Sequence, residues 1–197
     1  MAKRLVIAVA RHGQTDSNVK GLWVGASGDD PLNETGMQQA RALAQSLSKF
    51  DFDYVLSSDK KRATQTAEIV SKAMNVPIIG QREILRDRNY GYLEGLTTEQ
   101  IREKYGVEMK SLSKEIDDFG VTENVDSVVR RVKEFVESSK TIFDGKKIIV
   151  ITHGAFIRSF YEMFVGNSDG IRFTNCAHFV VAFEGDDPKL LMDLKTV

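Results

Sequence analysis

The sequence contains very little cysteine. Its 197 residues include one, Cys176, so the chain cannot form an internal disulfide, and a zinc site built from pairs of cysteines is excluded. A chain that relies on no disulfide fits a reducing compartment.

An excess of charge of either sign is also missing. Lys and Arg total 27 against 28 Asp and Glu, which leaves a formal net charge of −1. The sequence therefore has no global basic field to attract nucleic acid or an anionic membrane, and we expect neither as a partner. Any affinity for anions has to be local.

Long hydrophobic runs are absent as well. The apolar stretch that begins at Leu5 covers about six residues before Arg11, which is too short for a membrane span or a signal peptide. We therefore expect a cytoplasmic protein. With 42% hydrophobic residues and no internal repeat, the chain has enough apolar material for one substantial core, which predicts a single domain over residues 1–197.

Short apolar runs alternate with helical patterns along the chain. Most runs are continuously apolar, which is typical of strands buried on both faces of a parallel sheet. A turn cluster from Gly185 to Pro188 separates the last two runs and predicts an antiparallel hairpin. The chain is therefore predicted to be an α/β protein, a three-layer α/β/α sandwich with a mostly parallel central sheet. The predicted strands are 5–10, 54–56, 76–79, 148–151, 179–183 and, more weakly, 190–194.

The helical patterns place apolar residues three and four positions apart. Asn33 is the expected N-cap of the first helix, and Ser58 or Asp59 that of the second. Residues 82–123 are the least regular part and are expected to carry short helices over one edge. Within them, the charged run 110–118 predicts a solvated face. The predicted helices lie within residues 33–50, 57–74, 125–143 and 153–166.

Cationic side chains follow three of the predicted strands. Arg11 and His12 come after the first strand, Arg62 lies in the first turn of the helix after the second, and His153 follows the fourth. In a parallel α/β sheet, ligands gather at the carboxyl ends of the strands. Two arginines and two histidines at one rim need an anion to neutralise them, and guanidinium groups and helix N-termini suit a phosphate.

These motifs resemble those of the histidine phosphatase superfamily, also called the phosphoglycerate mutase-like family. The stretch "RHGQTDSN" is similar to its RHG(E/Q)TxxN signature, "DKKRATQTA" to its second arginine motif and "THG" to its second histidine motif. The segments "DPLNETGMQQA" and "ENVDSVVRRV" also resemble the family, so the resemblance covers nearly the whole chain.

The resemblance implies a phosphohistidine mechanism. His12 would be the nucleophile, which requires its attacking nitrogen to be unprotonated and its other ring N–H to be held by an acceptor. Arg11, Arg62 and His153 would surround the equatorial oxygens and stabilise the transferring phosphoryl group. Because they supply the positive charge, no metal and no cofactor are expected. The competing interpretation of Arg62 is a solvated helix residue like its neighbours Lys60 and Lys61.

Three further residues are expected to contact the substrate. Asn18 can donate its amide to a phosphate oxygen. Gly154 belongs to the second histidine motif, and Tyr90 is a candidate for lining the pocket. By contrast, His178 has no motif partner and is expected to be structural or on the surface, and Cys176 to be a small buried hydrophobe.

The proton donor departs from the family pattern. The family takes the proton from a glutamate in a segment similar to "LRDRNYGYLEG", where this chain has Asp87. Aspartate is shorter by one methylene, roughly 1.5 Å of reach. Asp87 is the predicted acid, and Glu83 and Glu94 are the local alternatives.

Hydrolysis is favoured over phosphoryl transfer between substrates. The chain has Thr98 where the mutases carry a lysine, has no proline-rich insert between Gly95 and Ile148, and has no long basic segment after Leu194. A small phosphorylated metabolite is therefore the expected substrate. The alternatives are a mutase primed by 2,3-bisphosphoglycerate and a phosphate-binding or phosphoprotein-binding module of weak activity. The sequence identifies neither the substrate nor the oligomeric state.

Overall fold

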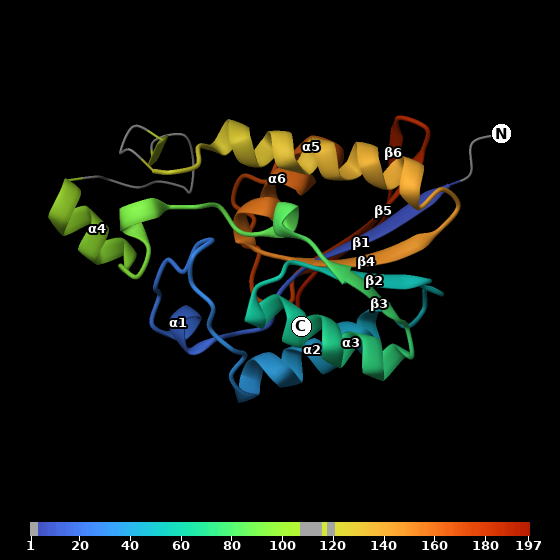
Figure 1. Cartoon of the computed structure of the whole chain (residues 1–197), viewed down its shortest axis with the longest axis horizontal. Helices are drawn as coiled ribbons and strands as arrows, with labels where there is room; N and C mark the ends of the chain where they lie inside the picture. The colour runs from blue at the N-terminus through green and yellow to red at the C-terminus, as the bar shows by residue number, and fades with distance from the viewer. Residues whose placement is uncertain (1–3, 107–115, 118–120) are drawn as a thin grey trace.

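The structure of the chain, a computed structural model, describes residues 4–106, 116–117 and 121–197. The strands in these ranges form one sheet in the order β3-β2-β4-β1-β5-β6 (Figure 1). Strands β1 to β4 are parallel, and β5 runs antiparallel to both β1 and β6. The bounds are Leu5–Arg11 (β1), Tyr54–Ser57 (β2), Ile78–Gln81 (β3), Lys147–Thr152 (β4), His178–Glu184 (β5) and Asp187–Lys195 (β6).

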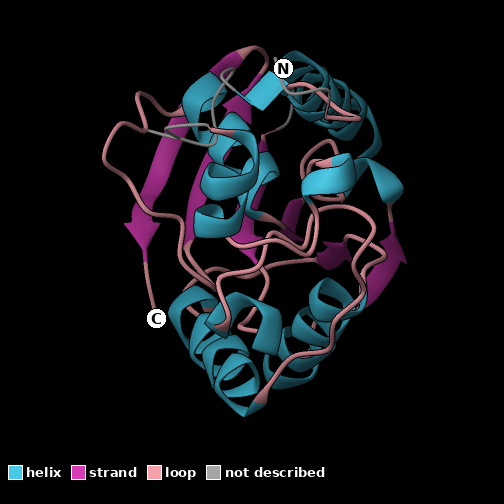
Figure 2. Ribbon diagram, turned by 90° about the vertical axis from the view of Figure 1, so that its left-hand side faces the viewer, coloured by secondary structure: helices cyan, strands magenta, loops and turns pink. Residues whose placement is uncertain are grey.

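Helices cover both faces of this sheet (Figures 1 and 2). Helices α2 (Glu34–Leu47) and α3 (Lys61–Met74) pack on one face, and α5 (Val125–Ile142) and α6 (Gly154–Phe164) on the other. Strand β1 serves both layers, because alternate side chains point to opposite faces. Leu5, Ile7 and Val9 pack with α5 and α6, while Val6, Ala8 and Ala10 pack with α2 and α3. The predicted three-layer fold with its antiparallel hairpin is confirmed.

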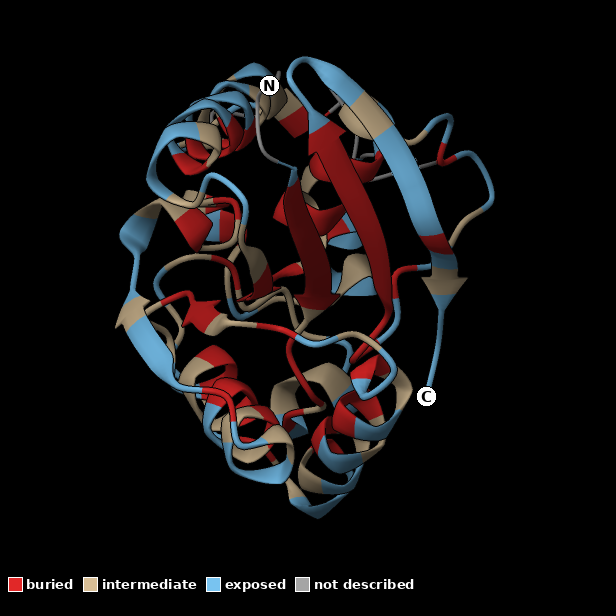
Figure 3. Ribbon diagram, turned by 90° about the vertical axis from the view of Figure 1, so that its right-hand side faces the viewer, coloured by how far each residue is buried: buried red, intermediate tan, exposed pale blue. Residues whose placement is uncertain are grey.

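The two edge strands differ from the expectation of burial on both faces. Most residues of β3 and β6 are exposed, as the pale blue ribbons in Figure 3 show. The third strand also begins later than predicted, at Ile78 rather than at Val76. Pro77 explains this shift, because proline has no N–H to donate to a ladder. Its carbonyl oxygen instead accepts from the N–H of Val55 at 2.9 Å.

The helix starts are capped in two different ways. Asn33 caps α2 as predicted, since its side chain accepts from the N–H of Gly36 at 2.9 Å. The prediction of Ser58 or Asp59 for α3 is wrong, because the N-cap is Lys60 and makes no side-chain cap. A carboxylate from a distant part of the sequence caps the helix instead, because the N–H of Lys61 donates to Asp29 at 2.7 Å.

Short helices do lie in the irregular region. They are two 3₁₀ turns, η1 (Glu83–Leu85) and η2 (Gly91–Leu93), followed by α4 (Thr98–Tyr105), and α1 (Asp16–Val19) follows the first strand. The charged run 110–118 lies outside the described residues except for 116–117. Of the helices that the structure describes, none has the length and apolarity to cross a bilayer.

A close approach of two glycines places the segment after β1 against α2. A Cβ added to Gly13 would lie 2.5 Å from the carbonyl oxygen of Gly36, and one added to Gly36 would lie 2.7 Å from the amide nitrogen of Gln14. Both contacts involve backbone atoms, so a change of side-chain rotamer cannot relieve the clash. Gly36 therefore lets the start of α2 approach residues 13–14.

We predict that Gly36→Ala destabilises the fold. The added methyl forces the segment after β1 away from α2, and overpacking of this kind costs about 1–3 kcal/mol. Urea denaturation measures the free energy of unfolding, with Thr35→Ala at the exposed neighbouring helix position as control. A Gly36→Ala protein within about 0.5 kcal/mol of the wild type would contradict the close approach.

Candidate active site

The predicted cationic residues meet at the carboxyl ends of β1 and β4. Arg11 is the last residue of β1 and pairs in register with Thr152 of β4, so the following His12 and His153 are neighbours. Their ring centroids lie 5.1 Å apart. From the first turn of α3, the Nε of Arg62 lies 3.3 Å from the Nε2 of His12. The arrangement joins three segments that are far apart in the sequence.

The hydrogen bonds of His12 define which ring nitrogen carries its proton. Nδ1 lies 2.7 Å from the carbonyl oxygen of Gly13, which only accepts, so Nδ1 is the protonated nitrogen. Nε2 faces the Nε–H of Arg62, which only donates, so Nε2 keeps its lone pair. Burial holds the pKa of His12 well below 6.5, and the charges of Arg11 and Arg62 lower it further. His12 is therefore neutral at pH 7.

Arg62 is buried and is held by backbone carbonyls. Its two terminal nitrogens donate to Gly28 and Gly25, each at 2.8 Å. Its own carbonyl accepts from the hydroxyl of Thr66, which in turn accepts from the N–H of Gly13. Thr66 thus links the segment of His12 and Gly13 to the helix that carries Arg62, a role that the sequence analysis did not predict. The interpretation of Arg62 as a solvated residue is wrong, because its side chain is fully buried.

Arg11 and His153 leave polar atoms without partners. The Nη1 of Arg11 donates to the carbonyl of Phe173 at 2.7 Å. Its Nε and both ring nitrogens of His153, although buried, have no hydrogen-bond partner within the described part of the chain. Unpaired polar groups of this kind cost about 1–3 kcal/mol each. Burial, followed by the charge of Arg62, holds the pKa of His153 well below 6.5. These atoms are available to a ligand.

A cavity of about 570 Å³ opens beside these groups. Arg11, Asn18, Asp87, Tyr90 and Gly154 of the predicted set line it. The predicted residues His12, Arg62 and His153 lie buried next to it rather than on its wall. The remaining lining residues, which the sequence did not single out as a group, are Gly21, Leu22, Trp23, Ala155, Arg158, Arg172, Phe173, Thr174 and Asn175.

Asn18 is oriented by its neighbours. Its amide oxygen accepts from the N–H of Thr15 at 3.2 Å and from the side chain of Asn175 at 2.9 Å. An amide whose oxygen is occupied in this way presents its NH₂ group as a donor. Asn175 also donates to the carbonyl of His12 at 3.2 Å, so it supports both the nucleophile and Asn18. Its position two residues after Phe173, just before β5, carried no recognisable signal.

Asp87 is attached to the start of α6. Its Oδ1 accepts from the N–H of Ala155 and from that of Arg88, each at 3.0 Å. No described residue bonds to Oδ2. Oδ1 therefore fixes the orientation of the carboxyl group at the start of α6.

The two alternative acids are occupied elsewhere. Glu83 is 77% exposed and pairs with Arg86. The carboxylate of Glu94 accepts from the backbone N–H groups of Ala26, Ser27 and Tyr90 at 3.0–3.1 Å. Glu94 thereby ties the 25–28 loop, whose carbonyls hold Arg62, to the segment that carries Asp87. It is a positioning residue.

Arg131 of α5 fixes the backbone beside Asp87. Its guanidinium donates to the carbonyls of Ile84 at 2.6 Å and Arg86 at 3.0 Å, and it pairs with Glu123 at 2.7 Å. Glu123 also accepts from the N–H of Asn89 at 3.1 Å. The Arg131–Glu123 ion pair therefore holds the backbone before Asp87, at Ile84 and Arg86, and after it, at Asn89.

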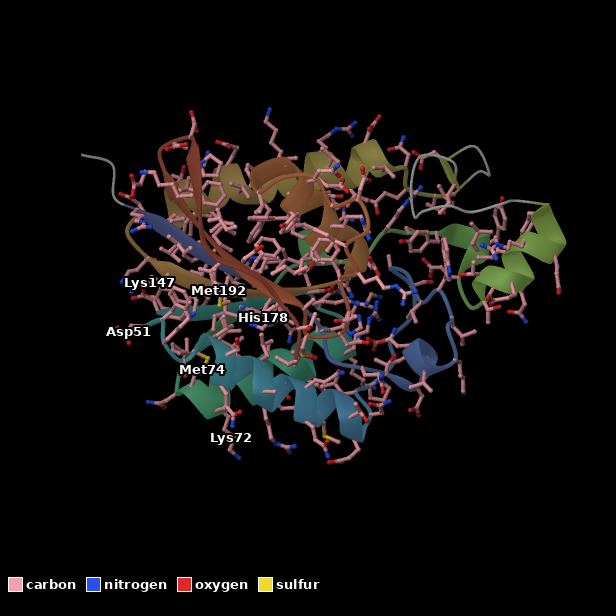
Figure 4. All side chains as sticks on the ribbon, turned by 180° about the vertical axis from the view of Figure 1, so that it is seen from behind. Asp51, Lys72, Met74, Lys147, His178 and Met192 are labelled. Carbon is pink, nitrogen blue, oxygen red and sulfur yellow. The ribbon has the colours of Figure 1, made fainter. Side chains whose placement is uncertain are left out.

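His178 and Cys176 do not belong to the candidate site. His178 faces α2 from β5 (Figure 4), where its ring bonds to the hydroxyl of Ser46 at 2.7 Å and to the carbonyl of Cys176 at 2.8 Å. Burial raises the pKa of the Cys176 thiol to about 12, so the thiol is not a nucleophile. Its backbone N–H supports the site, however, because it donates to the carbonyl of His12.

The chain matches the model of the histidine phosphatase superfamily, branch 1, over residues 7–193. It belongs to this superfamily. The match includes every residue of the site described above. A metal-independent phosphoserine phosphatase of Arabidopsis thaliana is 31% identical, with 95% of this chain and 79% of that protein covered. A 2,3-bisphosphoglycerate-dependent phosphoglycerate mutase of Cytophaga hutchinsonii is 30% identical, with 78% and 74% covered.

A solved histidine phosphatase fold is also similar in structure. Bacillus stearothermophilus YhfR superimposes with a TM-score of 0.81 at 25% identity, and 96% of each chain is covered. Relatives named as phosphatases and as mutases are therefore similar to this chain in sequence. Membership of the superfamily supports enzyme activity, and it leaves hydrolysis and mutase chemistry to be distinguished.

We predict that stability falls as the pH drops below about 6.5. The chain has three histidines, and the pKa of each is lowered by burial. Between its lowered pKa and about 6.5, each binds a proton in the unfolded chain but not in the fold, so stability is complete above this window. The loss is about 1.4 kcal/mol per pH unit for each histidine.

Urea denaturation between pH 7.5 and pH 5.5 measures this slope. His178→Gln removes one titrating group outside the candidate site and should reduce the slope by about one proton's contribution. A free energy of unfolding that does not change between pH 7 and pH 5.5 would mean that the folded chain already carries charged histidines.

Proposed function

We propose that the protein hydrolyses phosphomonoesters through a phosphohistidine on His12. The observation that carries this proposal is the unprotonated Nε2 of His12, which lies beside Arg62 and next to His153. In the first step, the N–P bond forms as the P–O bond to the leaving group breaks. In the second, water attacks phosphorus, and inorganic phosphate and free His12 are released.

The charge of the transferring group is balanced by the surrounding side chains. The phosphoryl oxygens accept from the unpaired Nε–H of Arg11 and from an N–H of His153. The Nε–H of Arg62 turns from the lone pair of His12 to the phosphoryl group as the N–P bond forms. These donors are in place before the reaction, so little reorganisation opposes the transition state. We infer that they do the work of a metal ion and that hydrolysis needs no cofactor.

Asp87 is the proposed proton donor to the leaving oxygen. Its Oδ2 carries the proton, while Oδ1 is held by the start of α6. In the second step, the ionised Asp87 takes a proton from the attacking water, which restores the starting state. Two contacts position this carboxyl group: the N–H of Ala155 donates to its Oδ1, and Arg131 donates to the neighbouring backbone carbonyls. We propose that this positioning compensates for the shorter side chain.

A mutase activity primed by 2,3-bisphosphoglycerate is the second candidate, because relatives with this name are about as similar as the phosphatases. The residue at position 98 favours hydrolysis, because this chain has Thr98 where the mutases carry a lysine. The hydroxyl of Thr98 accepts from the indole N–H of Trp23 at 3.1 Å and so supports the aromatic part of the cavity lining. A binding module without turnover is the third candidate, and the first experiment below distinguishes all three.

We predict that His12→Ala abolishes hydrolysis of p-nitrophenyl phosphate, with a fall of about a thousandfold or more, because it removes the nucleophile. Rapid acid-free quenching of the wild type with radiolabelled substrate should trap a base-stable, acid-labile phosphoenzyme that the variant lacks. His178→Gln is the matched control and should keep the phosphoenzyme. Absence of turnover in the wild type would support the binding module, and isomerisation of 3-phosphoglycerate that depends on bisphosphoglycerate would support the mutase.

We predict that Asp87→Asn slows alkyl phosphates far more than aryl phosphates. An alkoxide is a poor leaving group without a proton, so kcat for glycerol 1-phosphate should fall about a hundredfold. The p-nitrophenolate ion leaves unaided, and its ester should lose less than about tenfold. Asparagine keeps an oxygen for the N–H of Ala155, and Glu83→Gln is the control. Equal losses for both esters would assign the donor role to another group.

A further inference from the structure

We infer that the substrate carries a second anionic group, a carboxylate or a second phosphate, and that Arg172 binds it. This inference rests on the proposed function. Arg172 lies between α6 and β5 and lines the same cavity as Arg11 and Asp87. Its side chain is exposed and makes no hydrogen bond or ion pair with any described residue.

The charges that line the cavity are unequal. Three arginines and one carboxylate contribute to its wall, namely Arg11, Arg158, Arg172 and Asp87. The transferring phosphoryl group is a dianion, and Arg11 together with the buried Arg62 neutralises it. Arg158 lies 3.9 Å from Glu162. Arg172 is therefore the one lining cation that neither the phosphoryl group nor a described carboxylate matches.

Arg158 has a structural role that leaves the recognition role to Arg172. Its two terminal nitrogens donate to the hydroxyl of Ser168 at 2.7 Å and to the carbonyl of Ile171 at 3.1 Å. Its guanidinium also stacks on the ring of Phe173 at 5.1 Å. Arg158 thus contacts both neighbours of Arg172, the carbonyl of Ile171 and the ring of Phe173. A guanidinium presented from a fixed backbone can bind a carboxylate or phosphate through two parallel hydrogen bonds.

The aromatic residues of the lining offer no second binding site for an anionic group that would compete with Arg172. Trp23 and Tyr90 pack edge to face with centroids 4.9 Å apart, and the indole N–H of Trp23 is already donated to Thr98. Burial raises the pKa of Tyr90, so its hydroxyl stays neutral. A small organic group therefore fits against these rings, with one anionic end at His12 and the other at Arg172.

A matched pair of substrates tests the inference. 3-Phosphoglycerate and glycerol 1-phosphate share a carbon skeleton and an alkyl leaving oxygen, and they differ in a carboxylate against a hydroxymethyl group. We expect kcat/KM for phosphate release to be at least about tenfold higher for 3-phosphoglycerate. Arg172→Gln should remove this preference, mainly by raising KM, and Arg172→Lys should restore part of it. Glycerol 1,3-bisphosphate distinguishes a phosphate from a carboxylate at the second position.

Two controls separate the outcomes. Arg130→Gln changes an exposed arginine of α5 that does not line the cavity, and it should leave the preference intact. Hydrolysis of p-nitrophenyl phosphate, which has no second anionic group, should fall by a clearly smaller factor in Arg172→Gln than hydrolysis of 3-phosphoglycerate does. If the wild type hydrolyses this ester but prefers neither anionic substrate, or if Arg172→Gln slows all substrates equally, the inference is overturned while the proposed function stands. If the wild type hydrolyses no phosphate ester, the proposed function itself fails.

Discussion

The fold buries positive charge at the end of its central strands, and no described carboxylate forms an ion pair with it, although the charge of Asp87 lies near both Arg11 and Arg62. Arg62 is fully buried, yet its terminal nitrogens donate to the carbonyls of Gly25 and Gly28 rather than to an acid. Carbonyls satisfy the N–H groups without neutralising the charge, which Asp87 and Asp30 offset only in part and without an ion pair. Burial, followed by the charges of Arg11 and Arg62, holds the pKa of His12 well below 6.5 and keeps its ring neutral. An unprotonated imidazole nitrogen and a group of buried N–H donors without partners in the described chain therefore arise from one arrangement.

This arrangement depends on contacts between loops more than on the strands themselves. The strands bring Arg11, His12 and His153 together, but the position of Arg62 relies on the 25–28 loop. Glu94 holds that loop through the N–H groups of Ala26 and Ser27, and through Tyr90 it reaches the acid segment. The loop that holds Arg62 and the segment that carries Asp87 therefore share one carboxylate as a support. A change at Glu94 would disturb both, although Glu94 contacts neither His12 nor Asp87.

The elements that could be predicted from the sequence are those with a local signal. Apolar runs located β1, β2, β4 and β5, and the residues at their ends followed from the rule that parallel strands share a carboxyl edge. The cap of α3 was mispredicted because the carboxylate that accepts from the N–H of Lys61 belongs to Asp29, which lies 32 residues earlier in the chain. Thr66, Asn175 and Arg131 were missed for the same reason. Each acts through a contact with a distant segment, and neither periodicity nor residue type distinguishes it from its neighbours.

Asp87 shows why the length of a side chain is a weak guide to its reach. From the sequence, an aspartate in place of the family's glutamate leaves the acid about 1.5 Å short. In the fold, the distance to the site depends on where the backbone lies, and three separate contacts decide that. Arg131 grips the carbonyls of Ile84 and Arg86, Thr152 donates to the carbonyl of Leu85 at 2.8 Å, and Ala155 holds the carboxyl oxygen itself. Because Thr152 and Ala155 lie on either side of His153, the segment of Asp87 is attached directly to the segment that carries this histidine, which supports Asp87 as the proposed proton donor despite its shorter side chain.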